Sequence, residues 1–187
     1  MPIDDHFITP EYLKLLSENE AKFLLDHAEK QLKDILETNN LITGRTTMLM
    51  TVTVGITITF LGYAITKTIE AKFGVLALTA ALIVAYLIIA LFYMGRNFAP
   101  TSYMTAGAEP KQFFIDNVFN DDNAQYRLKA IYANEIEQYH YRIVENKKTN
   151  DHRWEIFNKS YNMVKFMPIV MAGTYGLAKL IFSLPLC

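Results

Sequence analysis

Residues 46–66 read TTMLMTVTVGITITFLGYAIT, and residues 73–94 read FGVLALTAALIVAYLIIALFYM. Neither stretch contains a charged residue, and only Lys67, Glu70 and Lys72 are charged between them. At about 1.5 Å of rise per residue, a helix of 21 or 22 residues covers about 30 Å, the thickness of the hydrocarbon core of a bilayer. Helices that are apolar on every face over this length are typical of membrane spans. The two stretches therefore exclude an ordinary soluble globular protein.

A third apolar segment, residues 166–187, is less regular. Lys179 is its only charged residue, and it contains two prolines and two glycines. Membrane spans tolerate both residue types, and Lys179 and Lys165 can extend toward the interfaces at either end. The segment favours a third span, with an interfacial or re-entrant helix as the alternative. The sequence thus predicts an all-α membrane protein with two transmembrane helices, a third, and long cytosolic helical extensions.

Capping residues predict where the helices outside the spans begin. Thr9 precedes a proline, which is typical of a helix N-cap. Ser17 and Glu20 have the spacing of a capping box, so a new helix is expected near Glu18. Apolar residues then recur at steps of three and four over residues 25–63. This repeat predicts one long helix that packs against partners both outside and inside the membrane.

The rest of the chain is also expected to be helical. The second span should end at Gly95, and a short helix is expected from Glu109 to about Phe119. From about Ala124 a long helical pattern continues to Pro168. We expect four segments: cytosolic N-terminal helices (1–45), a transmembrane hairpin (46–94), a cytosolic helical region (95–162) and a third transmembrane segment (163–187).

The basic residues that flank the spans predict the orientation. One side of the membrane would carry Arg45, Arg96, Arg153, Lys159 and Lys165. The opposite side would carry Lys67, Lys72 and Lys179. Because basic residues concentrate on the cytoplasmic side, the soluble parts of this multi-pass protein are expected in the cytoplasm.

Several functional classes are disfavoured by composition. A net charge of −1 gives no electrostatic footprint for a nucleic-acid polymer. The one cysteine, Cys187, excludes an intramolecular disulfide and a cysteine metal cluster. None of the common nucleotide, hydrolase or zinc-protease motifs is present. We therefore expect no enzyme: no catalytic residue, no metal and no cofactor.

The first span is rich in threonine. Its hydroxyls can bond to carbonyls one turn earlier, line a close helix contact, or face a pore, and the pattern leaves all three interpretations open. The six that lie between residues 46 and 59 are Thr46, Thr47, Thr51, Thr53, Thr57 and Thr59.

Polar residues interrupt the apolar stripe of the last long helix before the third segment. Asn146, Asn150 and Arg153 lie on the face that otherwise carries apolar and aromatic residues. On the first long helix Asn39 interrupts the stripe, and Arg45 stands at the membrane edge. Such residues can fix register or oligomer number. Alternatively, arginine clamps a small anionic ligand while asparagine reads a base edge, which makes Arg45, Asn146, Asn150 and Arg153 the candidate ligand-binding residues.

Several short motifs accompany this order of segments. They are Ala28-Glu29-Lys30-Gln31-Leu32, Asn39–Thr47, Glu109-Pro110-Lys111-Gln112-Phe113-Phe114, Glu135-Ile136, Asn146-Lys147-Lys148 and Trp154–Tyr161. In architecture and in these loose motifs, over about residues 21–185, the chain resembles the transmembrane effectors of bacterial Pycsar anti-phage systems.

The resemblance implies an effector in the cell inner membrane. Such a protein senses cyclic CMP or cyclic UMP from a partner cyclase and impairs membrane integrity, which stops growth of the infected cell. Three spans cannot enclose a pore alone, so we expect a homo-oligomer surrounded by membrane lipids. The alternative is a ligand-free helical scaffold or a small subunit of a membrane complex. A conventional channel or transporter is disfavoured, since the first two spans carry no charge.

Overall fold

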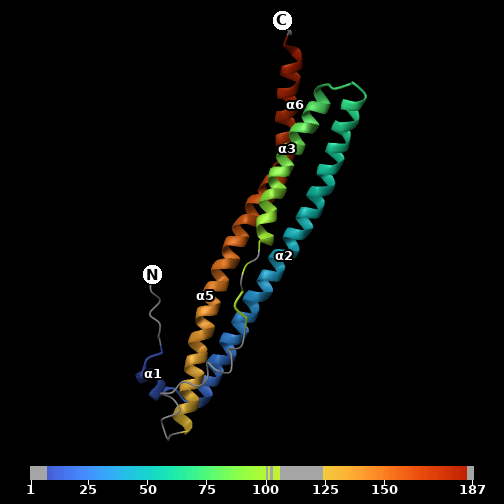
Figure 1. The fold of residues 1–187 in the computed structure, drawn as a ribbon. Coiled ribbons are helices and arrows are strands. Elements are labelled where there is room, and N and C mark those ends of the chain that lie inside the picture. The colour runs from blue at the N-terminus through green and yellow to red at the C-terminus, as the bar shows by residue number, and fades with distance from the viewer. Residues whose placement is uncertain (1–7, 100, 102, 106–123, 185–187) are drawn as a thin grey trace. The chain divides into compact units, whose positions relative to one another are not determined.

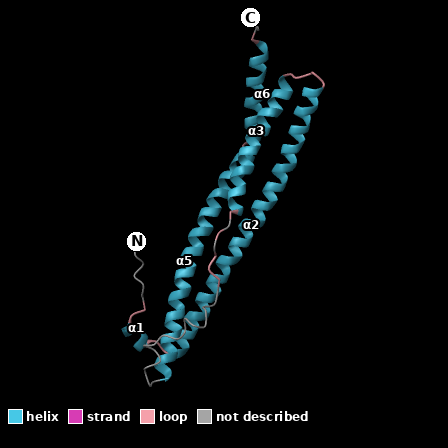
Figure 2. Ribbon diagram, viewed as in Figure 1, coloured by secondary structure: helices cyan, strands magenta, loops and turns pink. Residues whose placement is uncertain are grey.

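The computed structural model describes residues 8–99, 101, 103–105 and 124–184. Every regular element among these residues is a helix (Figure 2), which confirms the all-α prediction for the described part of the chain. The short helix predicted from Glu109 lies outside these residues. The elements are α1 (Pro10–Leu15), α2 (Glu18–Ile69), α3 (Val75–Gly95), η1 (Arg96–Phe98), α5 (Ala124–Lys165) and α6 (Met167–Ser183).

The predicted caps begin the first two helices. The Thr9 hydroxyl accepts a hydrogen bond from the backbone N–H of Tyr12, at 3.4 Å. The Glu20 carboxylate accepts from the backbone N–H of Ser17 at 2.7 Å, and the Ser17 hydroxyl accepts from the N–H of Glu20 at 3.3 Å. This reciprocal pair is the capping box, so α2 begins at Glu18 as predicted.

The two longest helices confirm the expected continuity. Helix α2 has 52 residues and passes through Gly44 without a break. Helix α5 has 42 residues and ends at Lys165. Phe166 then leaves the helical conformation, and Pro168 lies in the first turn of α6. Proline fits a first helical turn because the N–H that it lacks would have no partner there.

The chain forms two compact units, each built from two distant stretches. Unit 1 contains residues 1–39 and 101–150, and unit 2 contains residues 40–100 and 151–187. Helices α2 and α5 each contribute to both units. Each unit therefore has its own core.

The core of unit 1 forms between the first part of α2 and the first part of α5. Leu32 on α2 is fully buried and packs with Tyr139 and Ile143 on α5. Leu25, Ala28, Ile35 and Leu36 complete this cluster. The apolar stripe predicted on α2 is therefore covered here by its own chain.

The core of unit 2 involves α3 and α6, which lie side by side (Figure 1). Ile83 and Leu87 of α3 pack with Met167 of α6. Ile56, Phe60, Tyr86 and Met171 are packed against them.

Unit 2 also holds the candidate membrane spans. Helix α2 and the stretch Val75–Phe98 are long and apolar enough to cross a membrane. Helix α5, from Tyr126, and α6 are a third candidate as one pair, bent by 48° at the break. Large apolar side chains project outward from these helices, among them Met48, Ile58, Ile88, Phe92, Ile169 and Leu180.

A tight turn at one end of unit 2 joins α2 to α3. The N–H of Lys72 donates to the carbonyl of Lys67, and the N–H of Ala71 donates to that of Thr68. These two bonds form a Schellman motif, which places Ala71 in the left-handed conformation usually taken by glycine. Its φ is 55°. The connection between the two spans of the expected hairpin (46–94) thus takes a defined geometry.

Candidate functional site

Arg45 lies beside a pocket in unit 2, directly before the charge-free stretch of α2. Its guanidinium carbon stands 5.4 Å from the centre of the Trp154 ring. The pocket has a volume of about 560 Å³ and is lined by these two residues with Phe157, Asn158 and Tyr161. Its size falls in the range of small-molecule sites.

The aromatic residues of this Arg45 pocket come from one face of α5. Trp154, Phe157 and Tyr161 are spaced by three and four residues, which aligns them along the helix. The Trp154 and Phe157 rings meet edge to face at 5.4 Å, and the Phe157 and Tyr161 rings stack at 6.2 Å. The helix thus presents a short aromatic ladder beside a cation.

The chemistry of the Arg45 pocket suits an anion that carries a planar ring. Among the described residues, the exposed Arg45 guanidinium makes no hydrogen bond and no ion pair, so its donors face solvent. An arginine of this kind binds phosphate through two parallel hydrogen bonds. Aromatic rings stack on bases of any sequence, and the Asn158 amide offers a donor and an acceptor for a base edge.

Arg153, also in unit 2, is buried and ties three elements together. Its Nη2 donates to the Thr43 hydroxyl of α2 at 2.9 Å and to the Asn97 carbonyl of η1 at 3.0 Å. The Asn97 amide in turn donates to the Thr46 hydroxyl at 3.2 Å. This Arg153 network fixes α2, η1 and α5 to one another at the edge of the first span.

Asn146 and Asn150 are buried in unit 1, and their amides bond to the chain. Asn146 donates to the Met104 carbonyl at 2.8 Å and accepts from the Met104 N–H at 3.0 Å. Asn150 donates to the Ile35 carbonyl at 2.8 Å and accepts from the Tyr103 hydroxyl at 3.0 Å. Both amides therefore hold the segment around Tyr103 and α2 against α5.

The predicted ligand residues thus have different surroundings. Arg45 lines the pocket described above, whereas Asn146, Asn150 and Arg153 do not belong to its lining. The bonds of these three residues suit the register role, and their ligand role stays a prediction. The lining residues Trp154 to Tyr161 were missed as site residues, although their spacing of three and four residues was the available signal.

A buried ion pair in unit 1 was not predicted. The Oε1 atom of Glu135 lies 3.6 Å from the Nη1 atom of Arg142, and both side chains are about nine-tenths buried. Arg142 also stands over the Tyr139 ring at 5.5 Å. Such a pair is weak evidence for stability, since desolvation offsets its attraction.

The threonines of α2 bond mainly to their own helix. The hydroxyls of the six threonines at residues 46–59 each donate to the carbonyl four residues earlier, at 2.7–3.0 Å. Thr46, Thr53 and Thr57 are buried, whereas Thr47, Thr51 and Thr59 are exposed. Back-bonding is therefore common to all six, and the buried three also take part in helix packing.

No group of three or more His, Cys, Asp or Glu side chains in the described part of the chain could hold a metal ion. Comparison with models of protein families, with curated proteins and with solved structures gave no match.

Proposed function

We propose that this protein is a multi-pass inner-membrane effector of anti-phage defence, with its soluble parts in the cytoplasm. In this proposal a cyclic nucleotide such as cyclic CMP or cyclic UMP, made by a partner cyclase, binds in the Arg45 pocket. Binding changes the packing of the membrane helices in a homo-oligomer and impairs the membrane. Growth of the infected cell then stops.

The observation that carries the proposal is the position of the Arg45 pocket. A cation with solvent-facing donors, an aromatic ladder and an amide meet immediately before the charge-free stretch that begins at Thr46. A nucleotide monophosphate offers the complementary groups, an anionic phosphodiester and a planar base. The resemblance described above supports the choice of a cyclic pyrimidine nucleotide.

The mechanism follows from where the pocket residues lie. Arg45 belongs to α2, and the other four belong to α5. A ligand that contacts both helices favours the arrangement in which they are correctly spaced. It shifts the population by its difference in affinity for the two arrangements. Because α2 continues into the first span, its movement reaches the membrane without a further coupling element.

A ligand-free scaffold is the second candidate, and one observation favours it. The Asn146 and Asn150 amides and the Arg153 guanidinium bond to backbone and hydroxyl groups of the chain. In this alternative Arg45, Trp154 and Tyr161 anchor the helices at the membrane interface, where aromatic and basic residues gather.

Calorimetric titration of the purified full-length protein tests the proposal. Cyclic CMP, cyclic UMP and cyclic AMP are the probes. We expect the wild type to bind a cyclic pyrimidine nucleotide and Arg45→Ala to bind roughly ten- to a hundredfold more weakly, because a charge-assisted bond of about 1.5–3 kcal/mol is lost. Trp154→Ala should weaken binding by a similar factor through lost stacking.

Arg96→Ala is the matched control. Arg96 also stands over an aromatic ring, that of Tyr93 at 5.5 Å, but it does not line the Arg45 pocket. Its substitution should leave the affinity unchanged. Absence of nucleotide binding by the wild type, or equal affinity in Arg45→Ala, would contradict the effector proposal and favour the scaffold.

A further inference from the structure

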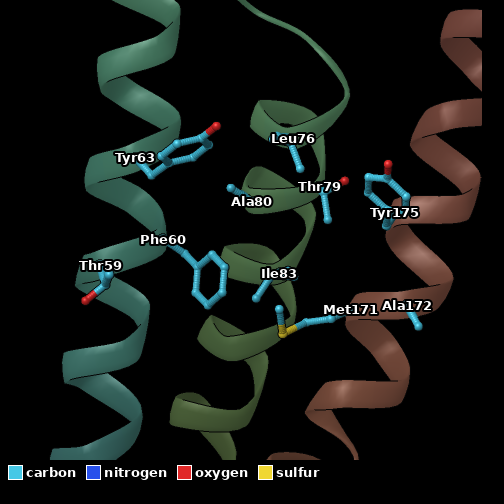
Figure 3. Close-up of a pocket in the computed structure, with 10 residues that line it drawn as sticks. All are labelled: Thr59, Phe60, Tyr63, Leu76, Thr79, Ala80, Ile83, Met171, Ala172 and Tyr175. Atoms are coloured by element: carbon cyan, nitrogen blue, oxygen red, sulfur yellow. The ribbon is translucent and has the colours of Figure 1, made fainter.

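An apolar groove lies between three helices of unit 2, and its volume is about 630 Å³ (Figure 3). Phe60 of α2, Ile83 of α3 and Met171 of α6 line it, one from each helix. The two threonines in its lining donate their hydroxyls to carbonyls of their own helices. The phenol groups of Tyr63 and Tyr175 are therefore its main polar groups.

A second, basic pocket adjoins the groove at the α2–α3 connection. It has a volume of about 330 Å³ and shares Tyr63 and Leu76 with the groove. Lys67, Lys72 and the first turn of α3 complete its lining. The apolar and the basic spaces are therefore neighbours along one side of α3.

The charges of the basic pocket are unequal. Lys67 is paired with Glu70 at 2.7 Å. Lys72 makes no ion pair within the described residues. The pocket thus keeps one net positive charge, and the backbone N–H groups of the first turn of α3, which has no side-chain cap, add to this potential.

We propose that the groove and the basic pocket together hold one anionic glycerophospholipid. An acyl chain lies in the groove among Phe60, Ile83 and Met171, and the phosphate lies beside Lys72 and the Tyr63 phenol. Charge complementarity selects this occupant: the basic pocket attracts a net negative headgroup, and the positive amine of a zwitterionic lipid offsets that attraction. This inference rests on the membrane insertion assumed in the proposed function.

Native mass spectrometry of the full-length protein, released from bilayers of phosphatidylglycerol and phosphatidylcholine, tests the headgroup. The wild type should retain one lipid per chain and prefer phosphatidylglycerol. Lys72→Gln should reduce this preference roughly fivefold, as expected for one basic residue at a membrane surface. Glu70→Gln should raise it, because Lys67 loses its partner. Lys179→Gln, outside both pockets, is the control and should change nothing.

A groove-filling variant tests the acyl chain. Ala172 lines the groove but is exposed, so Ala172→Trp fills the space without disturbing the core. It should lose the retained lipid whatever the headgroup. Leu177 is exposed on the same helix outside the groove, so Leu177→Trp should keep the lipid.

Retention of the lipid in Ala172→Trp would overturn the proposal, as would a wild-type preference for phosphatidylglycerol that survives in Lys72→Gln. A dimer of lipid-free chains in the wild type would also overturn it, since a second copy would then fill the groove.

Two further measurements separate this proposal from the proposed function. Carbonate extraction of cell membranes reports insertion, and calorimetry reports nucleotide binding at Arg45. A chain that is extracted by carbonate refutes both proposals. A chain that inserts and binds nucleotide but retains no lipid refutes the lipid site alone.

Discussion

The two units of this chain differ in what covers their cores. In unit 1 a small cluster around Leu32 lies beside the buried Glu135–Arg142 pair. The exterior of this unit mixes exposed charged residues, such as Lys22 and Asp26, with exposed apolar ones such as Phe23. In unit 2 the cluster around Leu87 lies beneath an exterior of large apolar side chains. Helices α2 and α5 thus contribute to two units with different exteriors. Apolar exteriors and back-bonded hydroxyls are what a membrane-spanning unit requires, and unit 2 has both; its polar contacts gather at the Arg153 network.

The largest effect is expected from a charge in the core of unit 1. Leu32→Asp places an unpaired carboxylate among Tyr139 and Ile143, at a cost of about 3–5 kcal/mol. Hydrogen exchange should then show fast exchange in residues 18–39 and 124–150, while the spans of unit 2 stay protected. Lys33→Asp, on the exposed neighbour, should leave exchange unchanged. Simultaneous loss of protection in both units would show that they are one cooperative body.

The next largest effect is expected in unit 2, from loss of the Arg153 network. Arg153→Ala leaves the Asn97 carbonyl and the Thr43 hydroxyl without this donor, which costs about 1–3 kcal/mol. We expect a lower Tm in detergent and an unchanged nucleotide affinity. A weaker nucleotide affinity with an unchanged Tm would instead place Arg153 in the ligand site.

A stabilising change is expected at the α2–α3 turn. Ala71→Gly removes the steric cost of a left-handed conformation at φ 55°. The gain is about 1 kcal/mol, after the greater freedom of glycine in the unfolded chain is subtracted. Thermal unfolding in detergent measures it. Lys72→Gly is the comparison, and an equal gain there would mean that the turn carries no strain at Ala71.

The smallest effect concerns the capping box and pH. The Ser17 side chain and backbone donate to Glu20, and these bonds lower the pKa of its carboxyl below the ordinary value. Because the folded pKa is the lower one, the stabilisation is present above the ordinary glutamate value of about 4.3. It is lost as pH falls through the lowered pKa.

Amide exchange at the start of α2, followed during acidification, measures this loss. Ser17→Ala should show faster exchange already at neutral pH and a weaker pH dependence. Glu18→Gln lies in the same first turn and should retain the wild-type dependence. Equal pH dependence in Ser17→Ala and wild type would show that the capping box does not hold the helix start.

The helix boundaries were predictable because their causes are local. Thr9, Ser17 and Glu20 act within one turn of the groups that they bond to, and two charge-free runs of span length need no tertiary information. The bend after Lys165 was not predicted. A proline is compatible with both a continuous and a broken helix, and packing between α3 and α6 accompanies the broken form here.

The surroundings of the polar residues were less predictable. The stripe placed Asn146, Asn150 and Arg153 on an otherwise apolar face, and the structure buries all three. It did not identify their partners, since Met104 and Asn97 come from segments distant in sequence. The Arg45 pocket was missed for the same reason: spacing aligns Trp154 with Tyr161, but only the folded chain brings Arg45 to them.

The back-bonded threonines lower the polar cost of rotating the first candidate span about its axis. A hydroxyl that already has a hydrogen-bond acceptor in its own helix can face lipid or protein with nearly the same free energy. Rotation of α2 about its axis therefore leaves every threonine hydroxyl at residues 47–59 with its hydrogen-bond acceptor. Asparagine side chains at those positions would lose their partners in the same rotation. Two hydrogen bonds from other elements reach α2 at the start of this stretch: Arg153 donates to the Thr43 hydroxyl, and the Asn97 amide donates to the Thr46 hydroxyl. A rotation of α2 would therefore break polar contacts at one end of the candidate span rather than along its length.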